Sequence, residues 1–216
     1  MNKNAMEILS LSEAYGALKF GDFTLKSGRK SPYFFNAGEF NDARSFQAIG
    51  RGYAFALHDI YGDILPCDVL FGPAYKGIPL AMATSMGFYE CYGINVPFAF
   101  NRKEVKDHGE GGRVIGASLK GKRVYSADDV ISSGTTVQEI ANTIQKEEGI
   151  YAGVLLILNR GERGQGNLSA VQEVEERYKI PVIPILTFED ILNFAKNNHP
   201  LMVEPMEAYW EQYGAK

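Results

Sequence analysis

The stretch VYSADDVISSGTT, residues 124–136, joins a short apolar segment, two adjacent acids and a loop of small residues. The chain that follows, residues 136–148, has apolar side chains at helical spacing. Thr136 and Glu139 have the spacing of a capping box at the start of this helix. A strand, a loop and a helix in this order form the unit from which sheets of parallel strands are built.

The loop after the two acids has the composition of a monophosphate-binding site. Small side chains let backbone N–H groups surround an anion, and the N-terminus of the following helix adds a favourable dipole. Neither the Walker A pattern nor the dinucleotide fingerprint occurs here, which excludes those two kinds of phosphate loop. The loop residues are Ser132, Ser133, Gly134, Thr135 and Thr136.

Asp128 and Asp129 would repel a phosphate placed directly beside them. We therefore expect the two carboxylates to face another part of the same ligand. Carboxylates accept hydrogen bonds from a vicinal diol and can hold Mg²⁺ directly or through water. A sugar phosphate meets both requirements, with its phosphate in the loop and its diol on the acids. The alternative, that the acids only end a strand, leaves the loop unexplained.

Strand-like and helix-like segments alternate along the chain, which predicts an α/β fold with a mainly parallel sheet. Helices are expected over residues 4–19, 42–61 (with Asp42 as N-cap), 79–91 and 136–148. Strands are expected within 23–38, 68–77, 96–101, 124–127, 151–166 and 180–188. Ligands bind at the carboxyl ends of parallel strands. One rim should therefore carry four segments: Gly72-Pro73, Asn101-Arg102, Asp128-Asp129 and Asn159-Arg160.

Composition limits the classes of protein that the chain can represent. Its 216 residues, 45% of them hydrophobic, suit one domain spanning residues 1–216. A net charge of -4 argues against a general nucleic-acid coat, and the sequence has no signal peptide or membrane-spanning run. Cys67 and Cys91 suit reduced thiols in a cytoplasmic protein, and three scattered histidines argue against a zinc site.

The 124–136 stretch resembles the ribose-phosphate motif of the type I phosphoribosyltransferases, although Asp128 stands where members often have Glu and Ser126 interrupts the apolar strand. The resemblance implies a mainly parallel central sheet flanked by helices, with a small hood largely within residues 1–40. It also implies that one segment binds 5-phosphoribosyl 1-diphosphate and Mg²⁺, the metal meeting the two acids through water. The residues of that segment are Asp128, Asp129, Val130, Ile131, Ser132, Ser133, Gly134, Thr135 and Thr136.

Two further segments resemble parts of the orotate phosphoribosyltransferases. FGPAYKG (71–77) corresponds to a diphosphate-binding loop, with Tyr75 and Lys76. Most lysines are solvated surface residues, but the position of Lys76 at a predicted strand end favours the binding role. NRKEVKDHGEGG (101–112) is similar to the catalytic loop, about residues 102–113, which closes over the neighbouring subunit of a homodimer. Its composition alone fits a mobile solvated loop. The resemblance assigns donor-binding roles to Arg102, Lys103, Lys106 and His108, and catalytic roles to Lys103, Lys106, His108, Asp128 and Asp129.

FTLKSGRKSPYFFNAG (23–38) resembles the N-terminal segment of the same enzymes. There Lys26 would meet the phosphoribosyl donor, and Phe34 and Phe35 would border orotate, with one ring packing in the core. Arg29-Lys30 is interpreted as an exposed turn. Arg160 can clamp a carboxylate, which orotate has and uracil and the purines lack. Ser132, a small donor, agrees with orotate, because purine enzymes typically have an Asp there.

The implied enzyme is a pentosyltransferase of UMP biosynthesis. It would convert orotate and 5-phosphoribosyl 1-diphosphate to orotidine 5′-monophosphate and diphosphate. Three alternatives stay open: a regulator that keeps the pocket as a sensor, a purine enzyme of the same fold, and an unrelated phosphate-binding module. The intact cationic loop and the low isoelectric point of about 5.5 disfavour the first. Arg160 and Ser132 disfavour the second, and the third leaves the other segments unexplained. No strong base for N1 of orotate is evident.

Overall fold

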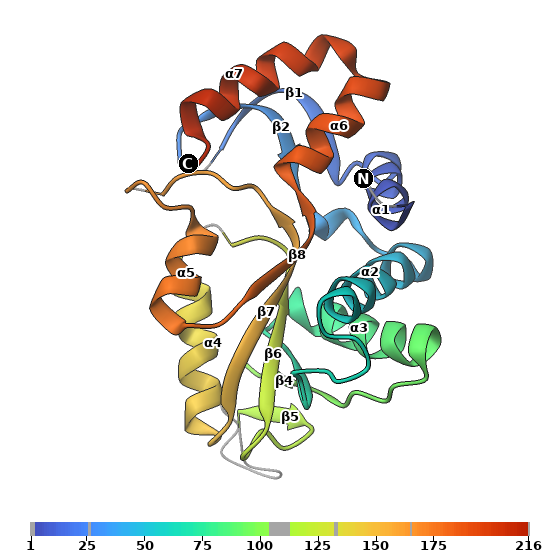
Figure 1. The fold of residues 1–216 in the computed structure, drawn as a ribbon, viewed down its shortest axis with the longest axis vertical. Coiled ribbons are helices and arrows are strands. Elements are labelled where there is room, and N and C mark those ends of the chain that lie inside the picture. The colour runs from blue at the N-terminus through green and yellow to red at the C-terminus, as the bar shows by residue number, and fades with distance from the viewer. Residues whose placement is uncertain (1–2, 26, 104–112, 132–133, 165, 216) are drawn as a thin grey trace.

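A six-stranded sheet forms the centre of the protein, with strand order β5-β4-β3-β6-β7-β8 (Figure 1). The computed structural model describes residues 3–25, 27–103, 113–131, 134–164 and 166–215. All neighbouring strands in this sheet run parallel except β5, which pairs antiparallel with β4. The prediction of a mainly parallel sheet is therefore confirmed. The strands are β3 (Val69–Gly72), β4 (Phe98–Asn101), β5 (Val114–Gly116), β6 (Arg123–Asp128), β7 (Ile150–Asn159) and β8 (Val182–Thr187).

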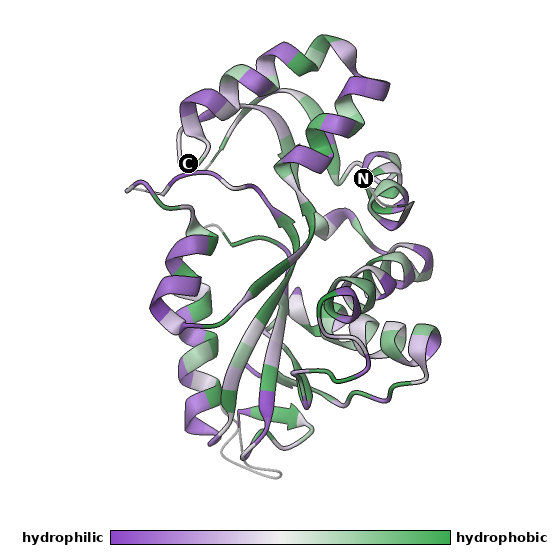
Figure 2. Cartoon of the chain, viewed as in Figure 1, coloured by the Kyte–Doolittle hydropathy of each residue, from purple (hydrophilic) through white to green (hydrophobic). Residues whose placement is uncertain are grey.

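Helices cover both faces of this sheet, as Figure 1 shows. On one face lie α2 (Ala43–Tyr61) and α3 (Gly77–Tyr92), and on the other lie α4 (Gly134–Lys146) and α5 (Ala170–Tyr178). Hydrophobic residues concentrate along β6 and β7, while α4 and α5 carry hydrophilic residues on their outer sides (Figure 2). Among the described residues, no helix is long and apolar enough to cross a membrane.

A second, smaller sheet lies at one end of the molecule. It pairs β1 (Leu18–Thr24) antiparallel with β2 (Lys30–Phe35). Helices α6 (Phe188–Asn198) and α7 (Val203–Tyr213) lie over it, linked by the short helix η2 (Pro200–Met202), while η1 (Ala37–Glu39) leads from β2 to α2 (Figure 1). The buried ring of Tyr33 lies 6.0 Å from that of Phe188 and 6.4 Å from that of Tyr209. The two ends of the chain thus share one aromatic cluster.

Several element boundaries agree with the sequence, and the causes are local. Helix α2 begins after Asp42, whose carboxylate accepts from Ser45 N in a capping box. The first helix, α1 (Lys3–Ala14), is shorter than the predicted 4–19. It ends before Gly16, which adopts φ 71°, and the strand β1 begins at Leu18.

The start of α4 was predicted wrongly. The helix already begins at Gly134, so Thr136 lies inside its first turn and does not cap it. Strand β5 was not predicted, because three residues at a sheet edge give too short a pattern to recognise.

Helices α2 and α3 approach each other through glycines. A Cβ atom built on Gly87 of α3 would lie 2.3 Å from the carbonyl oxygen of Gly50 in α2, and one on Gly50 would lie 2.1 Å from the carbonyl oxygen of Ala83. Backbone atoms cannot move aside as the end of a side chain can. Because α3 directly follows the 71–77 loop, this close packing also fixes where that loop lies.

We expect Gly87→Ala to lower the free energy of unfolding by about 1–3 kcal/mol, the usual cost of overpacking. Helix propensity alone would instead raise the free energy of unfolding by about 1 kcal/mol, because it favours Ala over Gly. The sign of the measured change therefore separates the two effects. Gly166→Ala is the control, because nothing lies within 4 Å of a Cβ there. Urea denaturation of both variants measures the difference. A Gly87→Ala protein as stable as the parent would contradict the close contact.

Candidate active site

The two acids of the 124–136 stretch lie at the middle of the sheet rim. Asp128 is the last residue of β6, which runs between β3 and β7. The Tyr53 hydroxyl of α2 donates to the backbone oxygen of Asp128 at 2.7 Å. Asp129 N donates to Asp128 Oδ1 and Val130 N to Asp129 Oδ1, both at 2.9 Å. Both carboxylates are thereby held in place without using all of their acceptor positions.

Lys76 reaches across the rim to the acids. Its Nζ lies 3.0 Å from Asp129 Oδ2 and 3.4 Å from Asn36 Oδ1. The Lys76 side chain is 55% exposed, so this ion pair adds little stability, about 1 kcal/mol at most. Its importance is positional, because it joins the 71–77 segment to the end of β6.

The ends of β3 and β4 also meet at this rim. Ala74 N donates to Asn101 Oδ1 at 2.8 Å, and the Ala74–Tyr75 peptide bond is cis. The ammonium of Lys103 lies 4.8 Å from the centre of the exposed Tyr75 ring. Arg102 N donates to the backbone oxygen of Arg113 at 2.8 Å, which brings together the two ends of the predicted catalytic loop.

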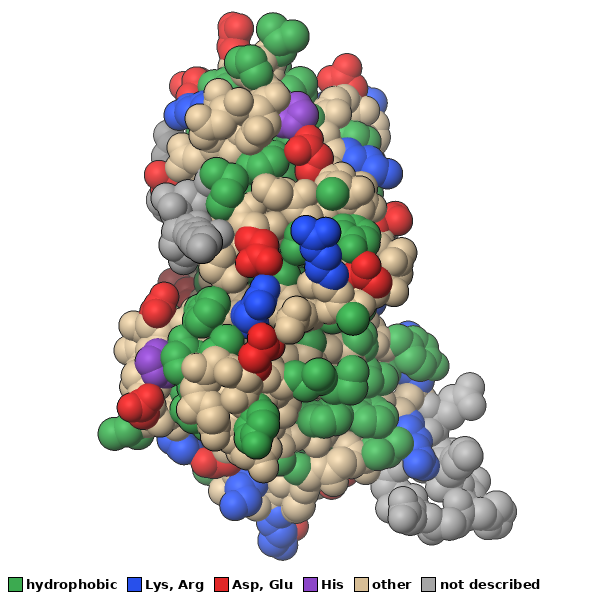
Figure 3. All heavy atoms as spheres, turned by 90° about the vertical axis from the view of Figure 1, so that its right-hand side faces the viewer, with side chains coloured by type: hydrophobic (Ala, Val, Ile, Leu, Met, Phe, Trp, Pro, Cys, Tyr) green, Lys and Arg blue, Asp and Glu red, His purple; other side chains and the backbone are tan. Residues whose placement is uncertain are grey.

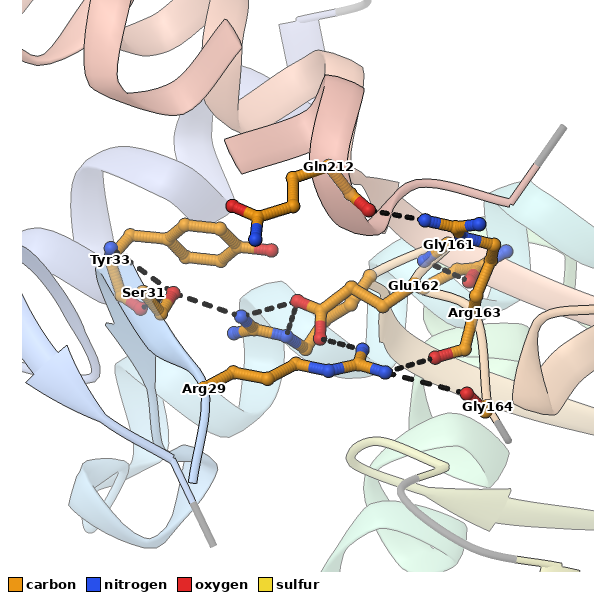
Figure 4. Close-up of polar contacts among 10 residues, drawn as sticks. Arg29, Ser31, Tyr33, Gly161, Glu162, Arg163, Gly164 and Gln212 are labelled. Atoms are coloured by element: carbon orange, nitrogen blue, oxygen red, sulfur yellow. Dashed lines mark hydrogen bonds and ion pairs between the residues drawn. The ribbon is translucent and has the colours of Figure 1, made fainter. Parts of the chain in front are cut away.

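Arg160 follows β7 and is largely buried, with 15% of its side chain exposed. Its Nε donates to Glu162 Oε1 at 2.7 Å, and its Nη2 donates to Ser31 Oγ at 3.2 Å. The guanidinium carbon lies 4.2 Å from the centre of the Tyr33 ring. Figure 4 shows Ser31, Tyr33 and Glu162 gathered in this region, where the small sheet meets the rim.

Arg29 is part of the same cluster, so its interpretation as an exposed turn was wrong. Its Nη2 donates to the backbone oxygens of Arg163 at 2.8 Å and Gly164 at 3.4 Å (Figure 4). Its Nη1 lies 3.6 Å from Glu162 Oε2, and its guanidinium lies over the Tyr213 ring at 4.8 Å. These partners are more than 130 residues away in sequence, so no local pattern could reveal them.

The two adjacent phenylalanines of β2 differ in burial, as the alternation of side chains along a strand requires. Phe35 is buried in the core, whereas Phe34 is 37% exposed and its ring lies 5.6 Å from that of Phe23. Phe34 is therefore the ring with a free face, on the same strand as Ser31.

The remaining candidate residues divide between described and undescribed parts of the chain. Val130 packs against the main core and Ile131 against the cluster beneath α4 and α5, while Gly134, Thr135 and Thr136 form the first turn of α4. Five candidates lie outside the described residues: Lys26, Lys106, His108, Ser132 and Ser133. The sequence placed Asn101 at the rim but gave it no role, and it missed Tyr53, Asn36 and Glu162. Asn36 and Glu162 had a signal, because each is a polar residue shortly after a strand end.

Burial raises the pKa of Asp128 to about 7, and the negative charge of Asp129 adds to this shift. The described residues contain no group of three or more His, Cys, Asp or Glu side chains that could hold a metal ion. Asp128 and Asp129 offer two carboxylates only. Such a donor set fits Mg²⁺ that takes most of its ligands from a bound phosphate compound and water.

Comparison with known proteins identifies the class. The phosphoribosyl transferase domain matches residues 37–177, which is well over half of the chain. The chain therefore belongs to the phosphoribosyltransferase family.

Its relatives place it more narrowly. It is 50% identical to the orotate phosphoribosyltransferase of Nitrosococcus oceani over 97% of this chain and 95% of the relative. It is 51% identical to that of Neisseria meningitidis serogroup C, over 97% of each chain. The crystal structure of the Francisella tularensis orotate phosphoribosyltransferase superposes with a TM-score of 0.85 at 38% identity, covering 96% of this chain and 99% of that one. Within the family, the chain is one of the orotate phosphoribosyltransferases.

We expect Asp128→Asn to stabilise the fold at alkaline pH, because it removes a buried charge. Below about pH 4 Asp128 is protonated in both the folded and the unfolded chain. Between there and pH 7 the unfolded chain ionises first, and above pH 7 the folded state bears the full cost of the buried carboxylate. The variant should gain about 1–4 kcal/mol over the parent at pH 8, and the gain should fall toward its minimum near pH 4.

Urea denaturation of parent and variant at pH 4, 6 and 8 measures this difference. A stability difference that does not change with pH would contradict a raised pKa for Asp128.

Proposed function

We propose that this chain transfers the 5-phosphoribosyl group from 5-phosphoribosyl 1-diphosphate to orotate, giving orotidine 5′-monophosphate and diphosphate for UMP biosynthesis. The observation that carries the proposal is the meeting of Lys76 with Asp129 at one rim, beside the end of β7 that leads to Arg160. Lys76, the two acids and Arg160 thus follow neighbouring strand ends, which supports roles for them toward a diphosphate, a ribose and a carboxylate.

The donor would extend along the rim from α4 to Lys76. Its 5′-phosphate would lie at the start of α4, where Ser132, Ser133, Gly134, Thr135 and Thr136 supply hydroxyl and N–H donors. The ribose diol would lie on Asp128 and Asp129, with Val130 and Ile131 fixing the turn. The diphosphate would meet cations and the Tyr75 loop: Lys26, Tyr75, Lys76, Arg102, Lys103, Lys106 and His108.

Orotate would lie between the small sheet and the rim. Arg160 would receive its carboxylate, Phe34 and the backbone of Phe35 would border its ring, and Ser132 would offer a hydrogen bond. In this arrangement the β1–β2 sheet, with α6 and α7 over it, is the hood of a single domain.

Catalysis would be mainly electrostatic. The C1 atom of the sugar passes through an oxocarbenium-like state, which the charges of Asp128 and Asp129 support while the diphosphate departs toward Lys76 and Lys103. Mg²⁺ held by substrate oxygens, with Asp128 and Asp129 reached through water, would supply further charge neutralisation. The phosphate loop anchors the far end of the sugar, so that binding energy orients C1 against N1 of orotate.

A homodimer would complete the site. Exposed apolar side chains gather over the face that α2 and α3 form (Figure 3), and those of α3 include Met82 (44% exposed), Met86 (64%) and Tyr89 (67%). A patch of this kind marks an interaction surface. The 102–113 loop would then act on the neighbouring site. A cytoplasmic location belongs to the same proposal, because both cysteines are free thiols.

The absorbance of orotate tests the function directly. With the donor and Mg²⁺ present, we expect a fall in orotate absorbance that requires all components. The absence of any donor-dependent change would reject the function, and a change with hypoxanthine in place of orotate would move the chain to the purine enzymes.

We expect Lys103→Ala to lower kcat by about a hundredfold, or roughly 3 kcal/mol, because a preorganised donor to the leaving group is lost. Orotate binding should change little, since Lys103 acts at the diphosphate end. Steady-state kinetics and orotate titration measure both quantities. Equal losses in kcat and in orotate affinity would count against a role confined to the transition state.

Mixing two inactive variants tests the shared site. Consider a mixed dimer in which one subunit carries Lys103→Ala and the other carries Asp129→Asn. If the loop acts across the interface, one of its two sites carries both changes and the other carries neither. An equimolar mixture should then regain about a quarter of the parent activity after subunit exchange. A mixture that stays as inactive as its components, despite exchange, argues against loop donation between subunits.

A further inference from the structure

The buried Arg160–Glu162–Arg29 cluster is more elaborate than a single carboxylate clamp requires. One oxygen of Glu162, Oε1, accepts from Arg160 Nε at 2.7 Å and lies 2.6 Å from Arg160 Nη2. Its other oxygen, Oε2, lies 3.6 Å from Arg29 Nη1. The three side chains are only 15%, 13% and 23% exposed. Two guanidinium groups therefore share one carboxylate, and the cluster carries a net charge of about +1.

The contacts of Glu162 and Ser31 leave one nitrogen of Arg160 unused. Nε and Nη2 are occupied by Glu162 and Ser31, whereas Nη1 forms no hydrogen bond within the described part of the chain. A ligand carboxylate can accept from Nη1, and a second, parallel bond from Nη2 would replace the one to Ser31. Since Glu162 holds one edge of the group and the Tyr33 ring covers one face, the plane of the guanidinium and the position of Nη1 are fixed.

Tyr33 and Tyr209 make the surroundings of the cluster poor in solvent. Both phenol oxygens are buried and have no hydrogen-bond partner among the residues that the structure describes. Burial raises the pKa of both phenols, so they stay neutral. In such surroundings an unbalanced charge is costly, and a well-placed opposite charge is strongly favoured.

We propose that Glu162 is a positioning residue for orotate specificity: it holds Arg160 so that only a ligand carboxylate completes the charge balance of the cluster. Arg29 supplies the second cation, which keeps Glu162 from neutralising Arg160 fully. An incoming carboxylate then takes the net charge from about +1 to about 0. A ligand without a carboxylate leaves the cation unbalanced. This inference rests on the proposed function, because it takes orotate as the acceptor.

The cluster also connects the parts of the protein that enclose orotate. Ser31 comes from β2, Glu162 from the chain after β7, and the Arg163 guanidinium bonds to the backbone oxygen of Gln212 in α7 (Figure 4). Backbone bonds reinforce the joint, since Arg163 N donates to the backbone oxygen of Tyr213 at 2.8 Å. The small sheet therefore contacts Arg160 itself, and the C-terminal helix holds the chain three residues beyond it.

Comparing two nucleotides isolates the contribution of the carboxylate. Orotidine 5′-monophosphate and UMP share the ribose phosphate and differ only in the carboxylate. The Kd of UMP divided by the Kd of orotidine 5′-monophosphate therefore measures how strongly the carboxylate is recognised. We expect Glu162→Gln to reduce this ratio about tenfold, mainly by weakening orotidine 5′-monophosphate binding, with the Kd of UMP within about twofold of the parent. Gln keeps the shape of Glu but has no charge to hold the two guanidiniums.

Glu207→Gln is the matched control, because it removes an exposed acid of α7, outside the site, that lies 3.7 Å from Lys196. The ratio of the two nucleotide Kd values for Glu207→Gln should equal that of the parent. If Glu162→Gln does not fold, Glu162→Asp gives the same test, since the shorter carboxylate cannot reach both nitrogens of Arg160, and the ratio should fall at least threefold.

An unchanged or increased ratio in Glu162→Gln overturns the inference, as does an equal loss of affinity for both nucleotides, which a purely structural role would produce. Failure of the proposed function itself would look different: the parent protein would bind neither nucleotide, or would bind both equally.

Discussion

The parallel pairing of β6 between β3 and β7 is the constraint on which the whole site depends. Parallel strands end at the same edge, so the acids after β6 lie beside the loop after β3 and the chain after β7. The Lys76–Asp129 ion pair and the Leu158 N to Asp129 O hydrogen bond, 3.1 Å long, are direct consequences. The glycine contact between α2 and α3 then holds the 71–77 loop against this edge.

Charged groups are buried at the site although their burial lowers the stability of the fold. Asp128 is costly to ionise where it lies, and Arg160 is removed from water with only a shared carboxylate for balance. Replacing such groups with apolar residues is often neutral or stabilising for a fold. Their presence is understandable for a site that must stabilise charge as it develops, because fixed charges in dry surroundings need no reorganisation during the reaction.

The sequence predicted those features whose causes are local. Asp42 marks the start of α2 because a cap acts within three residues. The apolar run of β3 ends in Gly72-Pro73, and those of β4, β6 and β7 end in polar residues. The same rule located Lys76, Asp128 and Arg160 at one rim. It failed where contacts are long-range: Arg29 looked like an exposed turn because its partners, Glu162 and the backbone of Arg163 and Gly164, come from the other end of the chain. Strand β5 was missed because three residues give too short a pattern, and its place is set by pairing with β4. The start of α4 was placed two residues late, at Thr136 instead of Gly134.

A crystal structure of the protein with orotidine 5′-monophosphate tests the central claim most directly, because this one molecule carries the phosphate, the ribose and the carboxylate together. The account predicts the phosphate at the start of α4, the ribose diol on Asp128 and Asp129, and the carboxylate on Nη1 of Arg160. A nucleotide bound away from the β6 rim, or with its carboxylate turned away from Arg160, would contradict it.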